Sequence, residues 1–221
     1  MSNITNNDLF DKTGIDYIDN FVFSQKNPWD LLPLIGNYTK KLVESGMDGF
    51  TLLEEGILIG KNVTIAKTAT IIGPCVIGHN VEIRPGAYIR GNVIVGDESV
   101  VGNSSELKNA ILMKHTQVPH YNYVGDSILG SYAHMGAGSI LSNLRSDNKA
   151  VIIHNEGEEI TTGIRKIGAI LGDHADIGCG AVLNPGTIIC KNTQVYPLTM
   201  CRGVYRANSI VKSTKEIVDK K

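Results

Sequence analysis

The stretch ILIGKNVTIAKTATIIGPCVIGHNVEIRPG (residues 57–86) repeats a six-residue pattern that decides the fold. An aliphatic residue recurs at every sixth position without interruption, at Ile59, Ile65, Ile71, Ile77, Ile83, Ile89, Val95, Val101, Leu107 and Met113. In an α-helix six residues advance by about 600°, so these side chains would spiral around the surface instead of forming one face. Short strands with a bend in every unit suit this period.

Three such units form one triangular coil of about 18 residues, and successive coils stack roughly 4.8 Å apart through backbone hydrogen bonds. The phase slips between Met113 and Val124 and returns at Leu129. It stops at a charged loop over 145–166 and resumes at Leu171. We therefore predict a β-helix over 57–212 with a loop insertion at 145–166. Because regular coils need no such loop, the insertion favours a functional role.

The segments outside the repeat differ in pattern. Residues 1–56 predict a helical N-terminal cap, with helices near Ile15–Phe23 and Trp29–Ser45. The apolar residues that begin at Trp29 are expected to cover the first coil, because an open coil exposes unpaired strand edges. The tail, 213–221, is predicted to form a short polar helix.

The composition is that of an ordinary soluble chain. Its 221 residues carry a formal net charge of −1, which gives no global field to attract nucleic acid or an anionic membrane. No apolar run is long enough to span a bilayer, and the polar N-terminus lacks a signal-peptide pattern. We expect a cytoplasmic protein with no nucleic-acid or membrane partner. The four cysteines are expected to be reduced and mostly buried.

Five segments carry a family resemblance: IRPGAYIRG (83–91), VGNSSELKNA (101–110), PHYNYVGDS (119–127), MGAGS (135–139) and SNLRSDNK (142–149). They resemble the acetyltransferase domain of bifunctional N-acetylglucosamine-1-phosphate uridyltransferases and archaeal-type sugar-phosphate nucleotidyltransferases. These are hexapeptide-repeat acyltransferases, so the resemblance implies a left-handed parallel β-helix. No glycine-rich nucleotidyltransferase signature precedes the repeat, and residues 1–56 are too few to hold that domain. The chain is expected to be the acetyltransferase part alone.

The resemblance also implies a reaction. The expected activity is N-acetylation of a phosphorylated amino sugar, with acetyl-CoA as acyl donor and no metal required. A homotrimer is expected, and a separate nucleotidyltransferase is a candidate partner. Acetyl-CoA would lie along the outside of later coils, where Ala137 and Cys179 match contact positions, Cys179 in place of a serine. The resemblance leaves open which amino sugar is used, whether it carries a 1-phosphate or a nucleotide, and whether the acyl group goes to nitrogen or oxygen.

The H-x-x-Y motif implies the catalytic residues. His120 matches the general base, and its imidazole suits removal of a proton from an amine near neutral pH. Tyr123 and Asn143 match residues that hold the sugar, and Asn143 also matches the catalytic residue that helps to stabilise the developing oxyanion. His134 stands where the bifunctional enzymes usually carry an asparagine that contacts the sugar.

The phosphate-binding residues include two alternatives. Lys108 and Lys149 match lysines that contact the sugar phosphate. The R-P-G-A motif favours Arg84 as their partner, whereas Arg90 lies one coil of 18 residues before Lys108 and would stack on the same face. The coil geometry favours Arg90 as the phosphate ligand. A local bulge would instead return Arg84 to the site, so both stay candidates.

Two other functions compete with this interpretation. His79, His115 and His120 reproduce the ligand spacing of γ-class carbonic anhydrases, another trimeric left-handed β-helix. His79 and His115 are expected two coils apart, too far to share a zinc ion within one chain, so a neighbouring subunit would have to supply a ligand. The second alternative is a β-helix without catalysis, serving in assembly or sugar binding.

Overall fold

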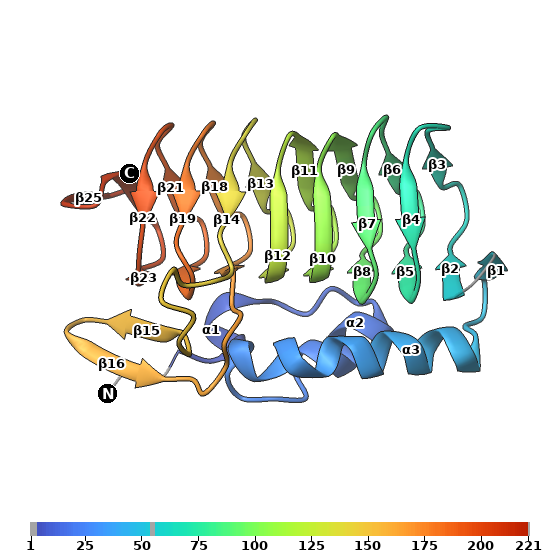
Figure 1. The fold of residues 1–221 in the computed structure, drawn as a ribbon, viewed down its shortest axis with the longest axis horizontal. Coiled ribbons are helices and arrows are strands. Elements are labelled where there is room, and N and C mark those ends of the chain that lie inside the picture. Colours follow the sequence, from blue (N-terminus) through green and yellow to red (C-terminus); the bar gives the residue numbers. More distant parts are fainter. Residues whose placement is uncertain (1–3, 54–55, 221) are drawn as a thin grey trace.

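The computed structural model describes residues 4–53 and 56–220. The repeat winds into a left-handed β-helix whose coils stack in a row, with a helical segment lying along one side (Figure 1). The chain is mainly β, and the predicted fold class is confirmed. Each coil has three faces, numbered here in the order in which the chain passes through them, and three corners between them.

Strands of the same face pair in parallel with those of the coils before and after. Face 1 contains β2 (Ile57–Ile59), β5 (Cys75–Ile77), β8 (Val93–Val95), β17 (Ala169–Leu171), β20 (Thr187–Ile189) and β23 (Val204–Tyr205). Face 2 contains β3 (Thr64–Ile65), β6 (Glu82–Ile83), β9 (Val100–Asn103), β11 (Gln117–His120), β13 (His134–Met135), β18 (Asp176–Ile177), β21 (Gln194–Val195) and β24 (Ser209–Ser213). Face 3 contains β4 (Thr70–Ile72), β7 (Tyr88–Arg90), β14 (Ile140–Leu141), β19 (Val182–Leu183) and β22 (Met200–Cys201). Two longer strands, β10 (Glu106–Leu112) and β12 (Tyr123–Leu129), pass from face 3 to face 1.

Two coils before the insertion are one residue shorter than the regular coils, and the missing residue lies at the corner between faces 3 and 1; after Cys201 the same corner is two residues shorter. Leu107 pairs with Ile89 on face 3, while Ala110 pairs with Val93 on face 1. The inner row therefore slips directly after Leu107, earlier than predicted. Met113 consequently leaves the inner row and is buried on the side of the helices. This short corner is what makes β10 and β12 continuous.

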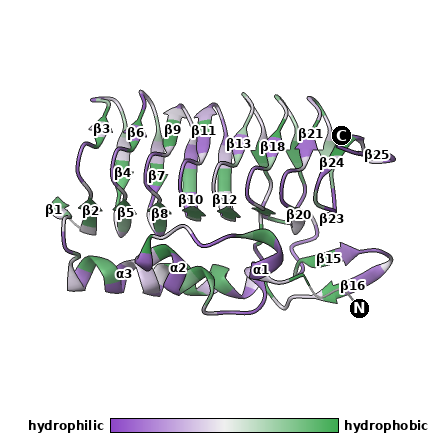
Figure 2. Ribbon diagram, turned by 180° about the vertical axis from the view of Figure 1, so that it is seen from behind, coloured by the Kyte–Doolittle hydropathy of each residue, from purple (hydrophilic) through white to green (hydrophobic). Residues whose placement is uncertain are grey.

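The N-terminal helices lie along face 1, not over the first coil as predicted. The segment consists of α1 (Asn6–Leu9), α2 (Asp16–Val22), the 3₁₀ helix η1 (Pro28–Leu34) and α3 (Ile35–Ser45). The middle residue of most face 1 strands points outward and is apolar, as at Ile94, Ile128 and Ile170, and these side chains are buried against the helices. Apolar segments of both layers meet there (Figure 2). Covering this row removes far more apolar surface from water than covering one coil end would.

The first coil carries β1 (Thr51–Leu53), which pairs antiparallel with β2. At the other end of the β-helix, the predicted tail helix is wrong. Residues Glu216–Asp219 form β25, which pairs antiparallel with β24. β24 is the last strand of face 2, and β25 supplies hydrogen-bond partners for its backbone. A short polar helix would leave these backbone groups unpaired. Residue 221 lies outside the described part of the chain.

The predicted insertion forms a β-hairpin of β15 (Ile152–Asn155) and β16 (Glu158–Thr161). It leaves the β-helix at the corner between faces 3 and 1, and its residues Val151 and Ile153 are fully buried in the apolar layer beside face 1. Cys75 and Cys201 are buried, whereas Cys179 is exposed at a corner, contrary to expectation. Within the described residues, no helix is long and apolar enough to cross a membrane.

Candidate active site on face 3

The last outward position of face 3 forms a column of side chains from coil to coil. Strand register pairs Lys108 with Gly125. Leu107 pairs with Ile89, so the next residues along the two strands, Lys108 and Arg90, are also neighbours. The same register continues through the later coils. The complete column runs Arg90, Lys108, Gly125, Ser142, Asn184 and Arg202. This column ends at the corner that is shortened in three coils and from which the insertion leaves the β-helix.

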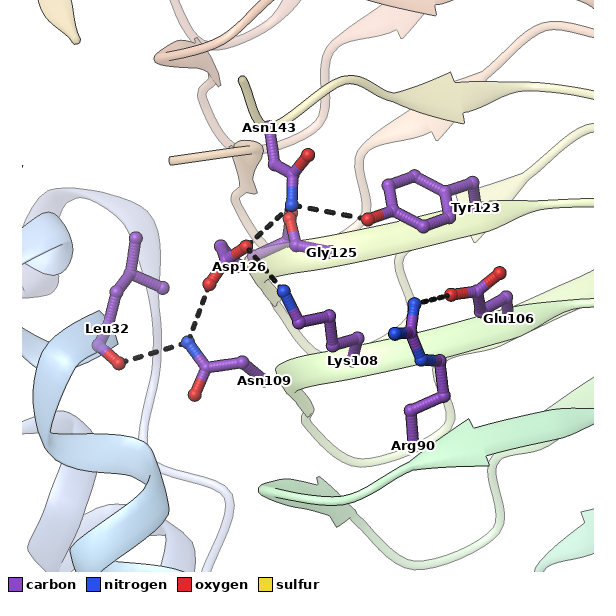
Figure 3. Close-up of polar contacts among 10 residues, drawn as sticks. Leu32, Arg90, Glu106, Lys108, Asn109, Tyr123, Gly125, Asp126 and Asn143 are labelled. Carbon is purple, nitrogen blue, oxygen red and sulfur yellow. Dashed lines mark hydrogen bonds and ion pairs between the residues drawn. The ribbon is translucent and has the colours of Figure 1, made fainter. Parts of the chain in front are cut away.

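A buried carboxylate organises the middle of this column (Figure 3). Asp126 is only 7% exposed and accepts hydrogen bonds from Asn143 Nδ2 at 2.6 Å and Asn109 Nδ2 at 2.9 Å. Lys108 Nζ lies 4.0 Å from its Oδ2. Asn109 also donates to the carbonyl oxygen of Leu32 in η1, at 3.2 Å. Asp126 thus joins two predicted site residues to the helical segment, and hydrogen bonds to such a charged acceptor are the strong kind.

The predicted pair Tyr123 and Asn143 comes together over Gly125. Asn143 Nδ2 donates a second hydrogen bond to the Tyr123 hydroxyl at 3.2 Å. A Cβ at Gly125 would lie 2.5 Å from that hydroxyl oxygen and 2.8 Å from Asn143 Nδ2, so any larger residue there would displace both groups. Burial, helped by the carboxylates of Glu106 and Asp126, raises the pKa of Tyr123. Its hydroxyl therefore stays protonated at neutral pH.

The two candidate arginines lie at different corners. Arg90 precedes Lys108 in the column, and its Nη1 donates to Glu106 Oε1 at 2.7 Å. Arg84 stands at the corner between faces 2 and 3 and binds both carboxylate oxygens of Glu82, at 3.0 and 3.2 Å. The register between Arg84 and Lys108 is regular, so no bulge brings Arg84 into the column. The structure groups Arg90, and not Arg84, with Lys108.

The predicted base and the predicted CoA-contacting residues form a second line, along the corner between faces 2 and 3. The backbone N–H of Gly138 donates to the carbonyl of His120, and that of Gly180 donates to the carbonyl of Ala137. His120, Ala137 and Cys179 are therefore exposed at equivalent places in three successive coils. The Asn122 side chain braces this corner, because it accepts from the backbone N–H of His120 and donates to the next coil.

Two other predicted residues stand apart from the face 3 column. His134 lies on face 2, where its Nδ1 is 2.9 Å from Asp176 Oδ1, and this hydrogen bond lowers the pKa of Asp176. Lys149 is exposed in the insertion, and its backbone N–H donates to Asp147. One chain brings together Lys108, Tyr123 and Asn143, with His120 three residues before Tyr123 at the adjoining corner.

The zinc arrangement is not formed within one chain. His79 and His115 lie at the corner between faces 1 and 2, whereas His120 lies one face further on. The short coil also changes the expected alignment, because His79 falls in register with Lys114 instead of His115. His115 Nε2 pairs with Glu98 Oε2. In the described ranges, 4–53 and 56–220, no group of three or more metal-ligating side chains gathers.

Sequence reasoning missed two carboxylates of this site, Glu106 and Asp126. Both stand inside the motif segments, in S-S-E-L-K and Y-V-G-D. Their spacing from Lys108 and Tyr123 was visible, but only the stacking of short coils shows that Asp126 faces Asn143 and Lys108.

Comparison with known proteins supports the fold and the motifs. The family model described as the GMPPB C-terminal domain matches residues 71–195. The chain is 33% identical over 198 residues to the bifunctional protein GlmU of Methanococcus maripaludis strain C5, covering 87% of this chain and 47% of that protein. It is 32% identical over 180 residues to a bifunctional sugar-1-phosphate nucleotidylyltransferase/acetyltransferase of Sulfurisphaera tokodaii, covering 81% of this chain and 41% of that protein. The chain spans about half the length of the curated relatives it matches.

A solved structure shares the fold. UDP-N-acetylglucosamine acyltransferase of Francisella novicida superposes with a TM-score of 0.50 at 15% identity, covering 70% of this chain and 57% of that one. The resemblance drawn from the five motif segments is confirmed by the relatives, and the fold by the superposition.

Proposed function

Since the chain belongs to the family of the GMPPB C-terminal domain, we propose that it is an acetyl-CoA-dependent N-acetyltransferase acting on a phosphorylated amino sugar. The Sulfurisphaera tokodaii relative, which matches 81% of this chain, carries acetyltransferase in its description. The observation that supports the proposal best is the grouping on face 3. Lys108, Tyr123 and Asn143 share one patch around Asp126, beside the corner that carries His120.

In the proposed reaction His120 is the general base. Its exposed imidazole accepts the proton that the amine of the acceptor must lose when its nitrogen attacks the thioester carbonyl carbon. The new C–N bond forms, the C–S bond breaks, and the departing thiolate takes the proton from His120. Ala137 and Cys179 follow His120 along the same corner, so a donor lying there would present its thioester to the base.

Asn143 has to exchange partners to stabilise the oxyanion. Its two amide hydrogens point at Asp126 and at the Tyr123 hydroxyl. The bond to Asp126 is the shorter, at 2.6 Å, so substrate would displace Tyr123. The Tyr123 hydroxyl is then free to bind the sugar, while Asp126 keeps the amide in place.

The ammonium of Lys108 and the guanidinium of Arg90 are the proposed phosphate ligands. Arg90 must release Glu106 to bind, which is an exchange between two anionic partners at an exposed site. Lys149 in the insertion and His134 on face 2 are proposed to contact the acceptor as well. Both lie away from the column, so they would act after a loop movement or from a neighbouring subunit.

A homotrimer fits this arrangement. Face 1 is covered by the chain's own helices, which leaves faces 2 and 3 for neighbours. The corner between those faces carries His120, so a neighbour packed there would complete a site that one chain leaves open. A separate nucleotidyltransferase is the proposed partner, because the Sulfurisphaera tokodaii relative, of which this chain covers 41%, combines both activities in its name.

A thiol-release assay tests this function. Glucosamine-1-phosphate, galactosamine-1-phosphate and UDP-linked amino sugars would each be offered with acetyl-CoA, with His120→Ala as the control that should lose activity. Mass spectrometry of the product distinguishes N-acetyl from O-acetyl transfer. Sugar binding without thiol release from any acceptor would refute the enzyme and favour a binding module instead.

A further inference from the structure

A groove of about 540 Å³ lies on face 3 beside the candidate active site. Its walls begin at Ser142 and Leu144, the two neighbours of Asn143, and continue over the later coils beneath the insertion. Asn184, Met200 and Arg202 also line it. This volume is in the usual range for small-molecule sites, roughly 300–1,000 Å³. Neither the motifs nor the proposed reaction assigns the groove a ligand.

The groove carries an arginine whose charge is not neutralised by a carboxylate. Arg202 Nη2 lies 2.8 Å from His154 Nε2, and His154 Nδ1 lies 3.5 Å from Glu159. Nε2 of His154 can accept a hydrogen bond from Arg202 only when the imidazole carries its proton on Nδ1 alone. In this tautomer Nδ1 can donate to the carboxylate of Glu159. Within the described ranges Arg202 forms no ion pair. A histidine, and not a carboxylate, therefore orients the guanidinium and leaves its charge for a ligand.

A second arginine, Arg145, lines the groove and is held in place by Asp147. Its Nε and Nη2 bind the two carboxylate oxygens at 2.9 and 2.7 Å. Two arginines and one aspartate give the groove a net positive charge. Leu144, Met200 and Pro185 add apolar surface between these charges. Such walls suit a ligand that is anionic in one part and apolar in another.

The insertion, whose residues Arg145, Asp147 and Ile152 line the groove, packs tightly on the later coils. A Cβ at Gly186 would lie 2.6 Å from the Val151 side chain, and a Cβ at Gly203 would lie 2.7 Å from the carbonyl oxygen of His154. Both glycines have positive φ, at 80° and 88°. The insertion thus packs against two later coils with no space for a side chain between them. This packing holds the insertion on the coils, so a ligand in the groove beside it would not have to order this segment.

The column of face 3 links this groove to the proposed sugar site. From Lys108 to Arg202 it crosses four coil spacings, roughly 19 Å between backbones at 4.8 Å each. Ser142 and Asn184 stand between the two cations. A sugar 1-phosphate held at Lys108 is too short to reach Arg202. A co-substrate that extends beyond the sugar or beyond the acetyl group is long enough to do so.

We propose that this groove binds the nucleoside diphosphate portion of a co-substrate, with Arg202 as its main ligand. The inference rests on the proposed acetyltransferase function. Two co-substrates contain this chemistry: a nucleotide-linked amino sugar as acceptor, and acetyl-CoA through its adenosine diphosphate part. In either case phosphate oxygens meet Arg202 and the base and ribose lie on the apolar wall.

Titration calorimetry with UDP and with ADP on the full chain tests the proposal without turnover. Arg202→Gln should weaken binding of at least one of them by about tenfold or more, the scale of one charged hydrogen bond. Arg202→Lys keeps the positive charge but loses the paired N–H donors of the guanidinium. Its affinity for the nucleotide should therefore lie between those of the wild type and Arg202→Gln. Arg206→Gln is the matched control, because Arg206 makes a surface ion pair with Asp219 outside the groove. Its binding should equal that of the wild type.

Michaelis constants then identify the source of the nucleotide. A raised KM for a UDP-linked acceptor in Arg202→Gln, with that for acetyl-CoA unchanged, assigns the groove to the acceptor. The reverse pattern assigns it to the donor. Unchanged binding of both UDP and ADP in a folded Arg202→Gln would overturn the proposal. If both nucleotides bind through Arg202 but no acceptor is acetylated, the groove is a nucleotide site and the proposed acetyltransferase reaction is wrong.

Discussion

Asp126→Asn tests whether the buried carboxylate organises the active site. One of its two oxygens becomes an amide NH₂, which faces a donor from Asn109 or Asn143 instead of accepting from it. Loss of one charged hydrogen bond costs about 1.5–3 kcal/mol of unfolding free energy. For a chain of this size each kcal/mol lowers Tm by about 2–4 °C, so we expect a decrease of about 3–12 °C.

The same change should impair catalysis beyond its effect on stability. Removing an oxyanion donor outright costs about 10²–10³ in kcat. Asp126→Asn leaves the Asn143 amide present but unanchored, so a loss of about 10-fold to 100-fold in kcat/KM is expected. Asn143→Ala sets the upper limit. Thermal unfolding followed by circular dichroism and the thiol-release assay would be run on the same preparations, well below the lowered Tm.

Asp173→Asn is the matched control. Asp173 is also buried and accepts two backbone hydrogen bonds, from Asp11 at 2.6 Å and Ser131 at 2.7 Å, but it stands at the corner between faces 1 and 2. The Asp173→Asn variant should have a lower Tm than the wild type and the same acetyl-transfer activity. If Asp126→Asn lowers Tm but transfers acetyl groups at the wild-type rate, Asp126 is only structural. If neither quantity changes, the inferred hydrogen bonds are absent in solution.

Four further predictions concern the base, the phosphate, the assembly and the helical cover. His120→Ala should lower acetyl transfer by about 10² or more with Tm unchanged, and equal turnover would reassign the base. Arg90→Ala should raise the KM for the sugar phosphate by about tenfold while Arg84→Ala stays near wild type, and the opposite result would show that the motif outweighs the coil geometry. Light scattering should give about three times 23.9 kDa, whereas a monomer at working concentration contradicts the shared site. Ile94→Ala should cost about 2–5 kcal/mol of unfolding free energy because its side chain is buried against the helices, whereas the half-exposed Ile140→Ala should cost little, as denaturant titration would show.

Local sequence pattern predicts where most of the N-terminal helices lie along the chain, but not where they pack. The positions of α2, η1 and α3 were predictable, because Pro28 and the apolar period of 29–45 are local signals, whereas α1 was not predicted. Their place along face 1 was not predicted, although a signal existed. Face 1 strands such as Ile57–Ile59, Cys75–Ile77 and Val93–Val95 are apolar on both sides, whereas a strand with one solvated face alternates. The tail was assigned to a helix because no local signal shows that an edge strand needs a partner.

The sequence alone determined the β-helix, its insertion and the residue types of the candidate site, because a six-residue period and short motifs are local properties of the chain. Only the tertiary structure decided which of these residues meet. One residue missing after Lys108 and another after Gly125 changed the corner, and this brought Asp126 onto Asn143 and separated His79 from the register of His115. Arg202 reaches the groove from a coil whose neighbour in space, the insertion, lies about 50 residues away along the chain. Which residues become neighbours in successive coils depends on the lengths of all the corners that precede them in the chain. A single missing residue therefore changes which later side chains meet, and no local sequence pattern shows this.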